Sequence, residues 1–332
     1  MVHLRTTNSW FGLLLAFTML SAFVQTVTGA ALDSRSTAKK SKVQAKVDTT
    51  TPRILVPLYI YPLPNAWDPL YSAIRANPTA AFTVIINPNS GPGSGSAPDS
   101  DYAAAIKTLK STASAGQVLE LVGYVPTGYG KTSATKVKAD VTKYAKWPAT
   151  VRPDGIFFDE TSTQSKYLAK YANFTDFVKS NKWSSSTTTT ISTAKSTTVK
   201  ATTARTGITI LNPGTWPQDA RFWSTSADHI VVYEDKLSNF NYTDYQHRTS
   251  KNHLGSTFQR SYIFYNVDPS NATTKDGKRF TSLDSLVNAT VTGLSSRGGL
   301  FITNLDIAST DVYAKFSTIW QRFVKSVASL SK

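Results

Sequence analysis

Eight short apolar runs, nearly unbroken by polar residues, are the feature of this 332-residue chain that most restricts its fold. Each run is rich in β-branched and aromatic residues. A continuous apolar run of this length is typical of a strand buried on both faces of a parallel sheet. The runs are residues 53–62, 82–88, 119–126, 154–160, 207–214, 229–235, 260–268 and 299–306.

Most segments between these runs have the apolar spacing of amphipathic helices. We expect helices in 101–114, 133–147, 165–180, 282–294 and 311–330. Strand and helix alternating eight times predict an α/β fold, a single-domain (β/α)8 TIM-type barrel over residues 53–330. Only 22 residues separate the starts of the fifth and sixth runs, at 207 and 229, so we expect a short fifth helix at 219–223.

A doubly wound open sheet is the alternative architecture. It would be favoured by a phosphate-binding glycine fingerprint after the first strand, and "YIYPLPNAWDP" contains none. The glycine-rich "NSGPGSG" (89–95) follows the second run, but it contains Pro92 and lacks the lysine of a phosphate cradle. We interpret this loop as the wall of a pocket.

The N-terminal segment, residues 1–30, has the pattern of a secretory signal peptide. Arg5 precedes an apolar run from Trp10 to Val24, and small residues follow at 28–31. An uncleaved membrane anchor is the alternative, although the run is shorter than the roughly 20 residues of a typical span. Polar, threonine-rich residues 31–52 are predicted to form a disordered linker.

A serine- and threonine-rich segment, residues 184–204, interrupts the pattern before the fifth strand. It holds 14 Ser or Thr among 21 residues. Such a stretch buries too little apolar surface to offset its ordering entropy, so we predict a flexible insertion, open to O-linked glycans.

Four Asn-x-Ser/Thr sequons fit passage through a glycosylating secretory pathway. They begin at Asn173, Asn241, Asn271 and Asn288. Together with residues 1–30 they predict a glycoprotein that is secreted or held at the cell surface.

Composition narrows the chemistry. The chain has no cysteine and four histidines, and no histidine pair has metal-ligand spacing. The Gly-x-Ser-x-Gly turn of serine hydrolases is absent. A net charge of +15 is spread over the sequence, so we interpret it as a solvated surface and expect no nucleic-acid partner. We therefore expect a monomer without metal or cofactor that works through carboxylates.

The ends of the eight runs carry acids, amides and aromatics, and no lysine or arginine. In a barrel the active site lies at the carboxyl ends of the strands. Aromatic rings stack on sugars, and amides and carboxylates bind hydroxyls, so this ring predicts a carbohydrate substrate. We predict as substrate-binding residues Tyr59, Tyr61, Asn87, Asn89, Tyr124, Asn212, Trp216, Asn266, Asn304 and Asp306.

Asp159, Glu160 and Glu234 are the candidate catalytic residues. Asp159 and Glu160 end the fourth run and Glu234 ends the sixth, so their carboxylates are expected to face each other across the barrel mouth. Glycoside hydrolysis needs such a pair. Neighbouring strand residues point to opposite faces, so we expect Asp159 to be central and Glu160 to support it. In the alternative reading, Asp159 caps the next helix and Glu234 pairs with Lys236.

At these residues the sequence resembles the spherulin-4 family, glycoside hydrolase family 135 of fungi and related microbes. The matching motifs are "VPLYIYP", "WDPLY", "IINPNSGPG", "VGYVPTGYG", "DGIFFDET", "LNPGT" and "VVYED". The resemblance implies a (β/α)8 barrel that hydrolyses α-1,4-linked N-acetylgalactosamine in galactosaminogalactan, a fungal surface polysaccharide. It also implies that Asp159, Glu160 and Glu234 are the catalytic acids.

Two other functions remain open. A chitinase-like hydrolase would carry Asp-Gly-x-Asp-x-Asp-x-Glu on the fourth strand, and "DGIFFDE" has Phe157 at one of the Asp positions. A non-catalytic wall or spore-coat protein would bind glycan on the same scaffold without cleaving it.

Overall fold

The computed structural model describes most of the chain beyond its N-terminal segment. The described residues are 52–183, 187–190, 200–203, 206–250, 260–292, 294, 298–308 and 311–330. The expected signal peptide (1–30) and nearly all of the linker (31–52) lie outside these ranges. Contacts divide the chain into Met1–Ala45 and Lys46–Lys332, and every described residue belongs to the second unit.

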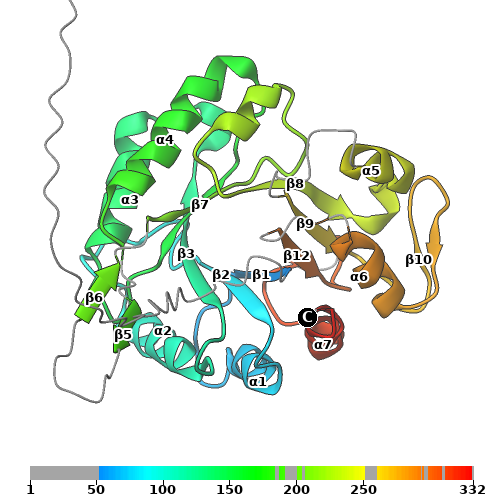
Figure 1. Ribbon diagram of the computed structural model, residues 1–332, viewed down its shortest axis with the longest axis horizontal. Helices are drawn as coiled ribbons and strands as arrows, with labels where there is room; N and C mark the ends of the chain where they lie inside the picture. Colours follow the sequence, from blue (N-terminus) through cyan, green and yellow to red (C-terminus); the bar gives the residue numbers. More distant parts are fainter. Residues whose placement is uncertain are drawn as a thin grey trace, which may run out of the picture. The chain divides into compact units, whose positions relative to one another are not determined.

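Eight parallel strands form a closed barrel, which confirms the predicted fold (Figure 1). They are β1 (Arg53–Leu58), β2 (Ala81–Ile86), β3 (Leu119–Pro126), β4 (Gly155–Asp159), β7 (Ile208–Leu211), β8 (His229–Lys236), β9 (Arg260–Tyr265) and β12 (Gly299–Ile302). Each strand pairs with the next in this order, and β12 pairs with β1 to close the ring. All eight lie within predicted runs or within one residue of them.

The strands are continuously apolar because both of their faces are covered. Every residue of β1 and of β2 is buried. In β4, Phe157 stacks on Tyr124 of β3 at 6.4 Å, whereas Phe158 stacks on Phe174 of the surrounding helix α4 (Leu168–Ser180) at 5.7 Å. Successive side chains therefore point alternately into the barrel and out toward the helices. Asp159 continues the inward face of Phe157.

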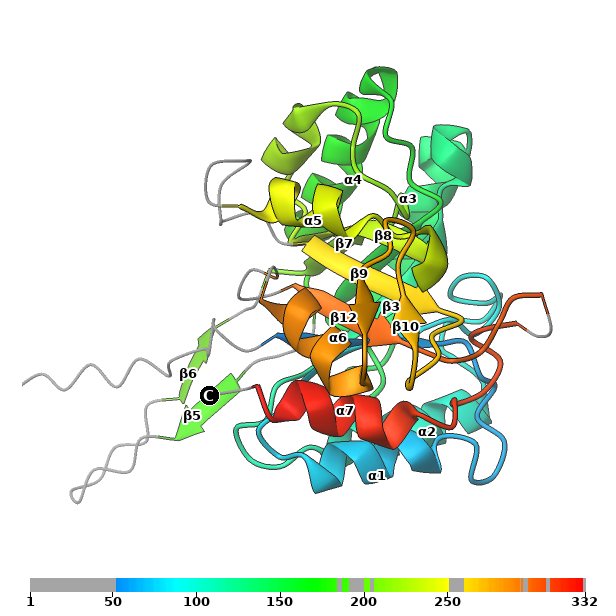
Figure 2. The ribbon, with the colours of Figure 1, turned by 90° about the vertical axis from the view of Figure 1, so that its right-hand side faces the viewer.

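Seven α-helices occur among the described residues, and they surround the barrel (Figures 1 and 2). They are α1 (Asp68–Ala76), α2 (Ser100–Thr112), α3 (Ala134–Lys146), α4 (Leu168–Ser180), α5 (Tyr242–Thr249), α6 (Leu283–Val291) and α7 (Trp320–Ala328). Polar side chains cap the amino-terminal ends of several helices. For example, Asp99 at the start of α2 accepts a hydrogen bond from the Tyr102 amide at 2.8 Å. In Figure 2, α7 lies beside α1 and α6, which closes the helical layer.

Short 3₁₀ turns complete the connections. They are η1 (Gly128–Gly130), η2 (Ser165–Tyr167), η3 (Ala220–Ser224) and η4 (Leu237–Asn239). The short fifth helix expected at 219–223 is η3, which is all that the brief connection between β7 and β8 accommodates.

The helix predicted over 311–330 is shorter than expected. Helix α7 begins only at Trp320, and residues 311–319 form turns. The side chain of Asp311 accepts a hydrogen bond from the amide of Tyr313 at 2.9 Å. Such a local side-chain bond competes with helix formation. The prediction was wrong here because apolar spacing alone does not detect this turn.

A buried ion pair closes the amino-terminal end of the barrel, opposite the predicted site. Arg53 of β1 is 1% exposed and pairs with Glu120 of β3 at 3.1 Å. The hydroxyl of Thr83 in β2 donates to the same carboxylate at 3.0 Å. The charges are thus compensated across three adjacent strands, as buried charges require.

Two small sheets lie outside the barrel. Within the segment 184–204, β5 (Thr187–Thr190) and β6 (Lys200–Thr203) pair antiparallel, and the rest of that segment lies outside the described residues. Its flexibility stays a prediction. A hairpin of β10 (Ala272–Thr273) and β11 (Arg279–Phe280) precedes α6 and was not expected from the sequence.

Candidate active site

Asp159 and Glu234 meet at the carboxyl-terminal end of the barrel. Asn212, the residue after β7, lies between them, and its amide nitrogen donates to Asp159 Oδ1 and to Glu234 Oε2 at 2.7 Å each. These two carboxylate oxygens are therefore at most 5.4 Å (twice 2.7 Å) apart. The structure brings the two acids together as the strand-end argument expected.

A β-bulge in β8 directs Glu234 into the barrel. Val231 pairs with Ser261, but Tyr233 pairs with the very next residue of β9, Tyr262, so Val232 is an extra residue. The ring of Tyr233 packs outward on Phe240 at 4.8 Å. Because neighbouring side chains alternate, Glu234 faces the interior.

The loop after β7 fits closely against Glu234. The carbonyl of Gly214 accepts from the Glu234 amide at 3.0 Å, and the amide of Gly214 donates to Asn212 Oδ1 at 3.0 Å. Gly214 has φ 63°, and a Cβ there would lie 3.4 Å from the Cβ of Glu234. The turn thus favours glycine for its backbone angle.

Tyr313 also contacts the pair. Its hydroxyl donates a hydrogen bond to Glu234 Oε1, so Glu234 receives one donor on each carboxylate oxygen. We did not predict this residue, because it lies eleven positions after β12 in a segment assigned to a helix. The only sequence signal is Asp311, whose side chain forms the turn that ends in Tyr313.

Burial raises the pKa of both acids. For Asp159 this effect is opposed by hydrogen bonds from Tyr124, from the Glu160 amide and from Asn212, which lower the pKa. The pKa of Glu234 is raised by burial and also by the negative charge of Asp159, against donors from Tyr313 and Asn212. Both acids therefore hold a proton more strongly than an exposed carboxyl group does, and their titrations are coupled.

Three tyrosines form the wall around the pair. The ring of Tyr59 contacts Tyr124 at 5.5 Å and Tyr313 at 5.2 Å, both edge to face. Burial, followed by the nearby carboxylates, raises the pKa of each of these phenols, so all three stay neutral. They supply hydroxyl donors and apolar ring faces to the same space.

Glu160 is adjacent to Asp159 in sequence but is turned away from the pair. Its backbone has φ 52°, in the left-handed region. Its Oε2 accepts from the amide of Gly128 at 3.1 Å, and its carbonyl accepts from the amide of Tyr129 at 2.6 Å. Glu160 thus contacts the loop after β3 rather than Glu234.

Tyr61 and Trp216 are not with the carboxylates. Tyr61 is 42% exposed, and its hydroxyl donates to Asp101 of α2 at 3.0 Å. The ring of Trp216 packs on Trp223 at 6.0 Å and on the guanidinium of Arg248 at 5.1 Å. These partners hold both rings, and a role of Tyr61 and Trp216 in substrate binding stays a prediction.

Asn87 shapes a loop rather than reaching the acids. Its side chain accepts from the amide of Gly91 at 3.0 Å, and its carbonyl accepts from the Tyr102 hydroxyl at 3.1 Å. Asn89 is exposed in the same loop. The glycine-rich segment is therefore held by Asn87, in line with a rigid wall.

The last two strands place their predicted residues on the rim, with other partners. Asn266 is exposed, and the side-chain amide of Asn304 donates to Thr318 at 2.8 Å. Asp306 pairs with Lys236 at 3.1 Å, and hydrogen bonds from the Ala308 amide and from Lys236 lower its pKa.

The alternative reading of the acids is not supported by these contacts. Lys236 pairs with Asp306 and not with Glu234. Helix α4 begins after Tyr167 without a side-chain cap, so Asp159 does not cap it. Of the predicted residues, Tyr59, Tyr124, Asp159, Asn212 and Glu234 form the site.

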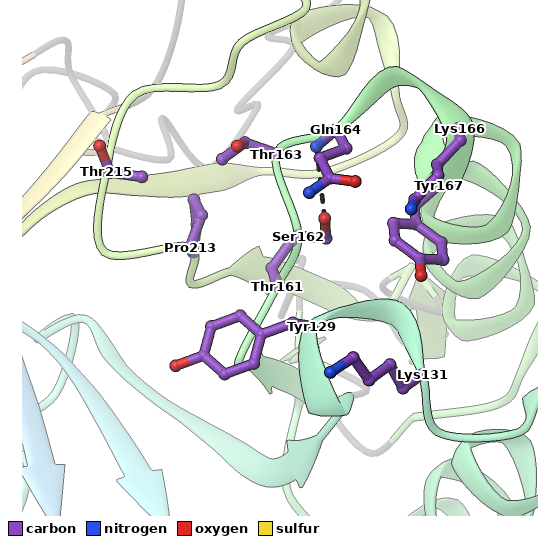
Figure 3. A pocket seen from close by; sticks show the side chains of 10 residues that line it. All are labelled: Tyr129, Lys131, Thr161, Ser162, Thr163, Gln164, Lys166, Tyr167, Pro213 and Thr215. Carbon is purple, nitrogen blue, oxygen red and sulfur yellow. Dashed lines mark hydrogen bonds between the residues drawn. The ribbon is translucent and has the colours of Figure 1, made fainter.

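An open pocket of about 390 Å³ adjoins this site (Figure 3). It is lined by Tyr129, Lys131, Thr161, Ser162, Thr163, Gln164, Lys166, Tyr167, Pro213 and Thr215. Thr161 donates its amide to the Asn212 carbonyl at 2.9 Å, so the pocket wall is tied to the residue that bridges the acids.

Metal and membrane sites can be judged within the described residues. No group of three His, Asp or Glu side chains in that part of the chain is arranged to hold a metal ion. The helices described there are all too short or too polar for a membrane crossing.

A family model and known proteins are similar to this chain. A family model, Spherulin4 (spherulation-specific family 4), matches residues 53–327. Spherulin-4 of Physarum polycephalum is 35% identical over 188 residues, which are 56% of this chain and 46% of the relative, so the match spans about half of that protein. Aspergillus clavatus Sph3, solved in complex with GalNAc, is 32% identical with a TM-score of 0.63; the match covers 84% of this chain and 98% of Sph3.

Proposed function

The chain belongs to spherulation-specific family 4, and we propose that it is a glycoside hydrolase acting on α-1,4-linked N-acetylgalactosamine within galactosaminogalactan-type polysaccharide. The observation that carries this proposal is the amide of Asn212 donating to Asp159 and Glu234 at 2.7 Å each. The GalNAc bound to the similar Sph3 supports the choice of sugar.

Glu234 is the general acid of the proposed reaction. Burial and the charge of Asp159 raise its pKa, which favours the protonated form that a general acid needs. It gives that proton to the glycosidic oxygen as the bond to the anomeric carbon breaks. Proton transfer of this kind typically contributes about 10²- to 10⁴-fold to the rate.

Asp159 is the proposed nucleophile. Three donors, from Tyr124, the Glu160 amide and Asn212, favour its ionised form. Its oxygen attacks the anomeric carbon and forms a glycosyl ester while the leaving sugar departs with the proton. Water then gives its proton to Glu234 and attacks the same carbon, which releases Asp159 as a carboxylate.

The separation of the two acids favours this double displacement. Inverting enzymes hold their carboxyl groups about 6.5–9.5 Å apart to admit a water, and retaining enzymes about 5–5.5 Å apart. Here the oxygens that share Asn212 are at most 5.4 Å apart (twice 2.7 Å). We therefore expect retention of the anomeric configuration.

The test compares wild-type protein with Asp159→Asn and Glu234→Gln on purified, acetylated galactosaminogalactan. We expect new reducing ends from the wild type and a loss of about 10³-fold or more in each variant. Asp235→Asn is the matched control, because Asp235 lies on the same rim but bonds to Tyr265 and Asn239 instead of the pair.

Three outcomes would contradict the proposal. Unchanged turnover in both variants would remove the acids from the mechanism. Binding of the polymer by the wild type without any new reducing ends would favour a non-catalytic wall or spore-coat protein. Release of chitin oligosaccharides in place of galactosamine products would favour the chitinase-like reading.

Secretion is proposed as well. The apolar run of residues 10–24 is that of a cleaved signal, and the four sequon asparagines are exposed. Protein from a eukaryotic host should begin near residue 31, and glycosidase treatment should lower its mass. A retained N-terminus in the membrane fraction would instead indicate an anchor.

A further inference from the structure

The turn of η1 holds an exposed tyrosine in an unfavourable backbone conformation. Gly128, Tyr129 and Gly130 all have positive φ, at 57°, 54° and 86°. For a tyrosine the left-handed region is unfavourable, because the Cβ lies too close to the following carbonyl oxygen. Tyr129 is 59% exposed, so burial of its ring in this protein does not offset that cost. Residues in such conformations cluster at functional sites.

Glu160 holds this turn through both its side chain and its backbone. Its carboxylate accepts from the Gly128 amide at 3.1 Å, and its carbonyl accepts from the Tyr129 amide at 2.6 Å. The hydroxyl of the fully buried Thr127 donates to the same carbonyl at 2.7 Å. The loops after β3 and β4 are thereby joined, with Tyr129 at the tip of the junction.

The ring of Tyr129 lies along one edge of the pocket next to the acids. In Figure 3 it extends below Thr161 and Pro213, while Tyr167 and Lys166 line the other side. The pocket is linked to the pair through Thr161 and Asn212. Burial and then the charges of Glu160, Asp159 and Glu234 raise the pKa of Tyr129, in keeping with a hydroxyl near all three acids.

We propose that this pocket is a subsite for a sugar residue next to the bond that is cleaved, that the ring of Tyr129 stacks on this sugar, and that Glu160 is a positioning residue which holds Tyr129 rather than an acid or base. This inference rests on the proposed function. In this proposal Glu160 positions Tyr129 and does not act on the bond that is cleaved.

The charge of the pocket defines the sugar that it accepts. Lys131 and Lys166 line it, and the ammonium group of Lys166 lies 5.0 Å from the centre of the Tyr167 ring. No acidic side chain is among the residues that line it. Beside these two ammonium groups a galactosamine with a protonated amine is disfavoured, whereas the neutral N-acetylated sugar is not.

The experiment measures kcat, KM and their pH dependence on N-acetylgalactosamine oligomers for Glu160→Gln, Glu160→Ala, Tyr129→Ala and Tyr129→Phe. A glutamine oxygen still accepts from the Gly128 amide, so Glu160→Gln should keep kcat within about threefold and both pH limits unchanged. Tyr129→Ala and Glu160→Ala should raise KM about tenfold with little change in kcat. Tyr129→Phe keeps the ring and should raise KM far less than Tyr129→Ala does.

Two results would overturn the inference. A loss of about 10²- to 10⁴-fold in kcat for Glu160→Gln, with one limb of the pH profile removed, would make Glu160 an acid or base. An unchanged KM in Tyr129→Ala would remove the stacking role. If the wild type cleaves nothing, the proposed function fails by itself, and the affinity of the oligomers for wild type and Tyr129→Ala, measured by calorimetry, still tests the subsite.

The exclusion of a free amine from the pocket can be tested with partly deacetylated substrates. Partly deacetylated oligomers should be cleaved with the free amine excluded from one position beside the cut, as read from the masses of the products. The double variant of Lys131→Gln and Lys166→Gln should relax this exclusion. The same product pattern in the double variant and the wild type would contradict the assignment.

Discussion

Replacing Asn212 by alanine should move the pH profile of catalysis to higher pH. Asn212 donates one hydrogen bond to Asp159 and one to Glu234, both at 2.7 Å. A hydrogen bond to a charged group has a net value of about 1.5–3 kcal/mol. Because one pKa unit is about 1.4 kcal/mol, losing the donor should raise each pKa by about one to two units.

The direction of the pH shift follows from the ionised state of the two acids, which Asn212 stabilises. Its amide donors favour the ionised carboxylates, so their removal favours the protonated forms and raises both pKa values. The acid limb, where Asp159 must lose its proton, moves up, and so does the alkaline limb, where Glu234 must keep its proton. The two limbs belong to the coupled pair, so the whole bell-shaped profile should shift.

Two measurements test this shift. The first is kcat against pH on acetylated oligomers, and the second is a substrate-free titration of the carboxyl carbons by ¹³C NMR. Asn239→Ala is the matched control, because Asn239 donates to Asp235 on the rim at 2.9 Å and does not contact the pair. A profile that stays in place or moves to lower pH in Asn212→Ala would refute the reasoning.

Three further predictions concern stability and the environment of Glu234. Burial and the charge of Asp159 raise the folded-state pKa of Glu234, so the contribution of Glu234 to stability is greatest below its unfolded pKa and is lost as the pH rises through its folded pKa. Glu234→Gln should therefore raise the melting temperature more at pH 8 than at pH 4. An equal effect at the two pH values would contradict this. Glu120→Ala leaves the buried charge of Arg53 without its carboxylate partner and should lower the free energy of unfolding by about 3–5 kcal/mol. Lys136→Ala, which breaks an exposed ion pair, should change it by under about 1 kcal/mol. Denaturant titration measures both. Tyr313→Phe removes a donor to Glu234 and should shift the alkaline limb of the kcat profile upward by more than the acid limb. A larger shift of the acid limb would count against the assignment of Glu234 as the acid.

The barrel could be predicted from the sequence because its strands are buried on both faces. That burial requires runs without polar interruption, and such runs stand out against the amphipathic helices between them. The alternation of side chains along β4 likewise placed Asp159 inward and Glu160 away from the pair. Burial on both faces and side-chain alternation are local properties of a strand, and the residue pattern shows them directly.

What could not be predicted depends on loops and on one irregular strand residue. The extra Val232 in β8 changes which side chains of that strand face inward, and no pattern in the sequence predicts this bulge. Tyr313 reaches Glu234 from a turn far beyond the last strand. Trp216 was predicted to bind substrate, and its ring packs on Trp223 and Arg248, contacts that its place in the sequence does not indicate.

The anomeric configuration of the first product tests the central claim most directly. ¹H NMR during the early cleavage of an N-acetylgalactosamine oligomer shows which anomer is released before mutarotation. Two carboxylates that share the amide of Asn212 should release the anomer already present in the polymer. First appearance of the opposite anomer, or no new reducing ends at all, would contradict the account.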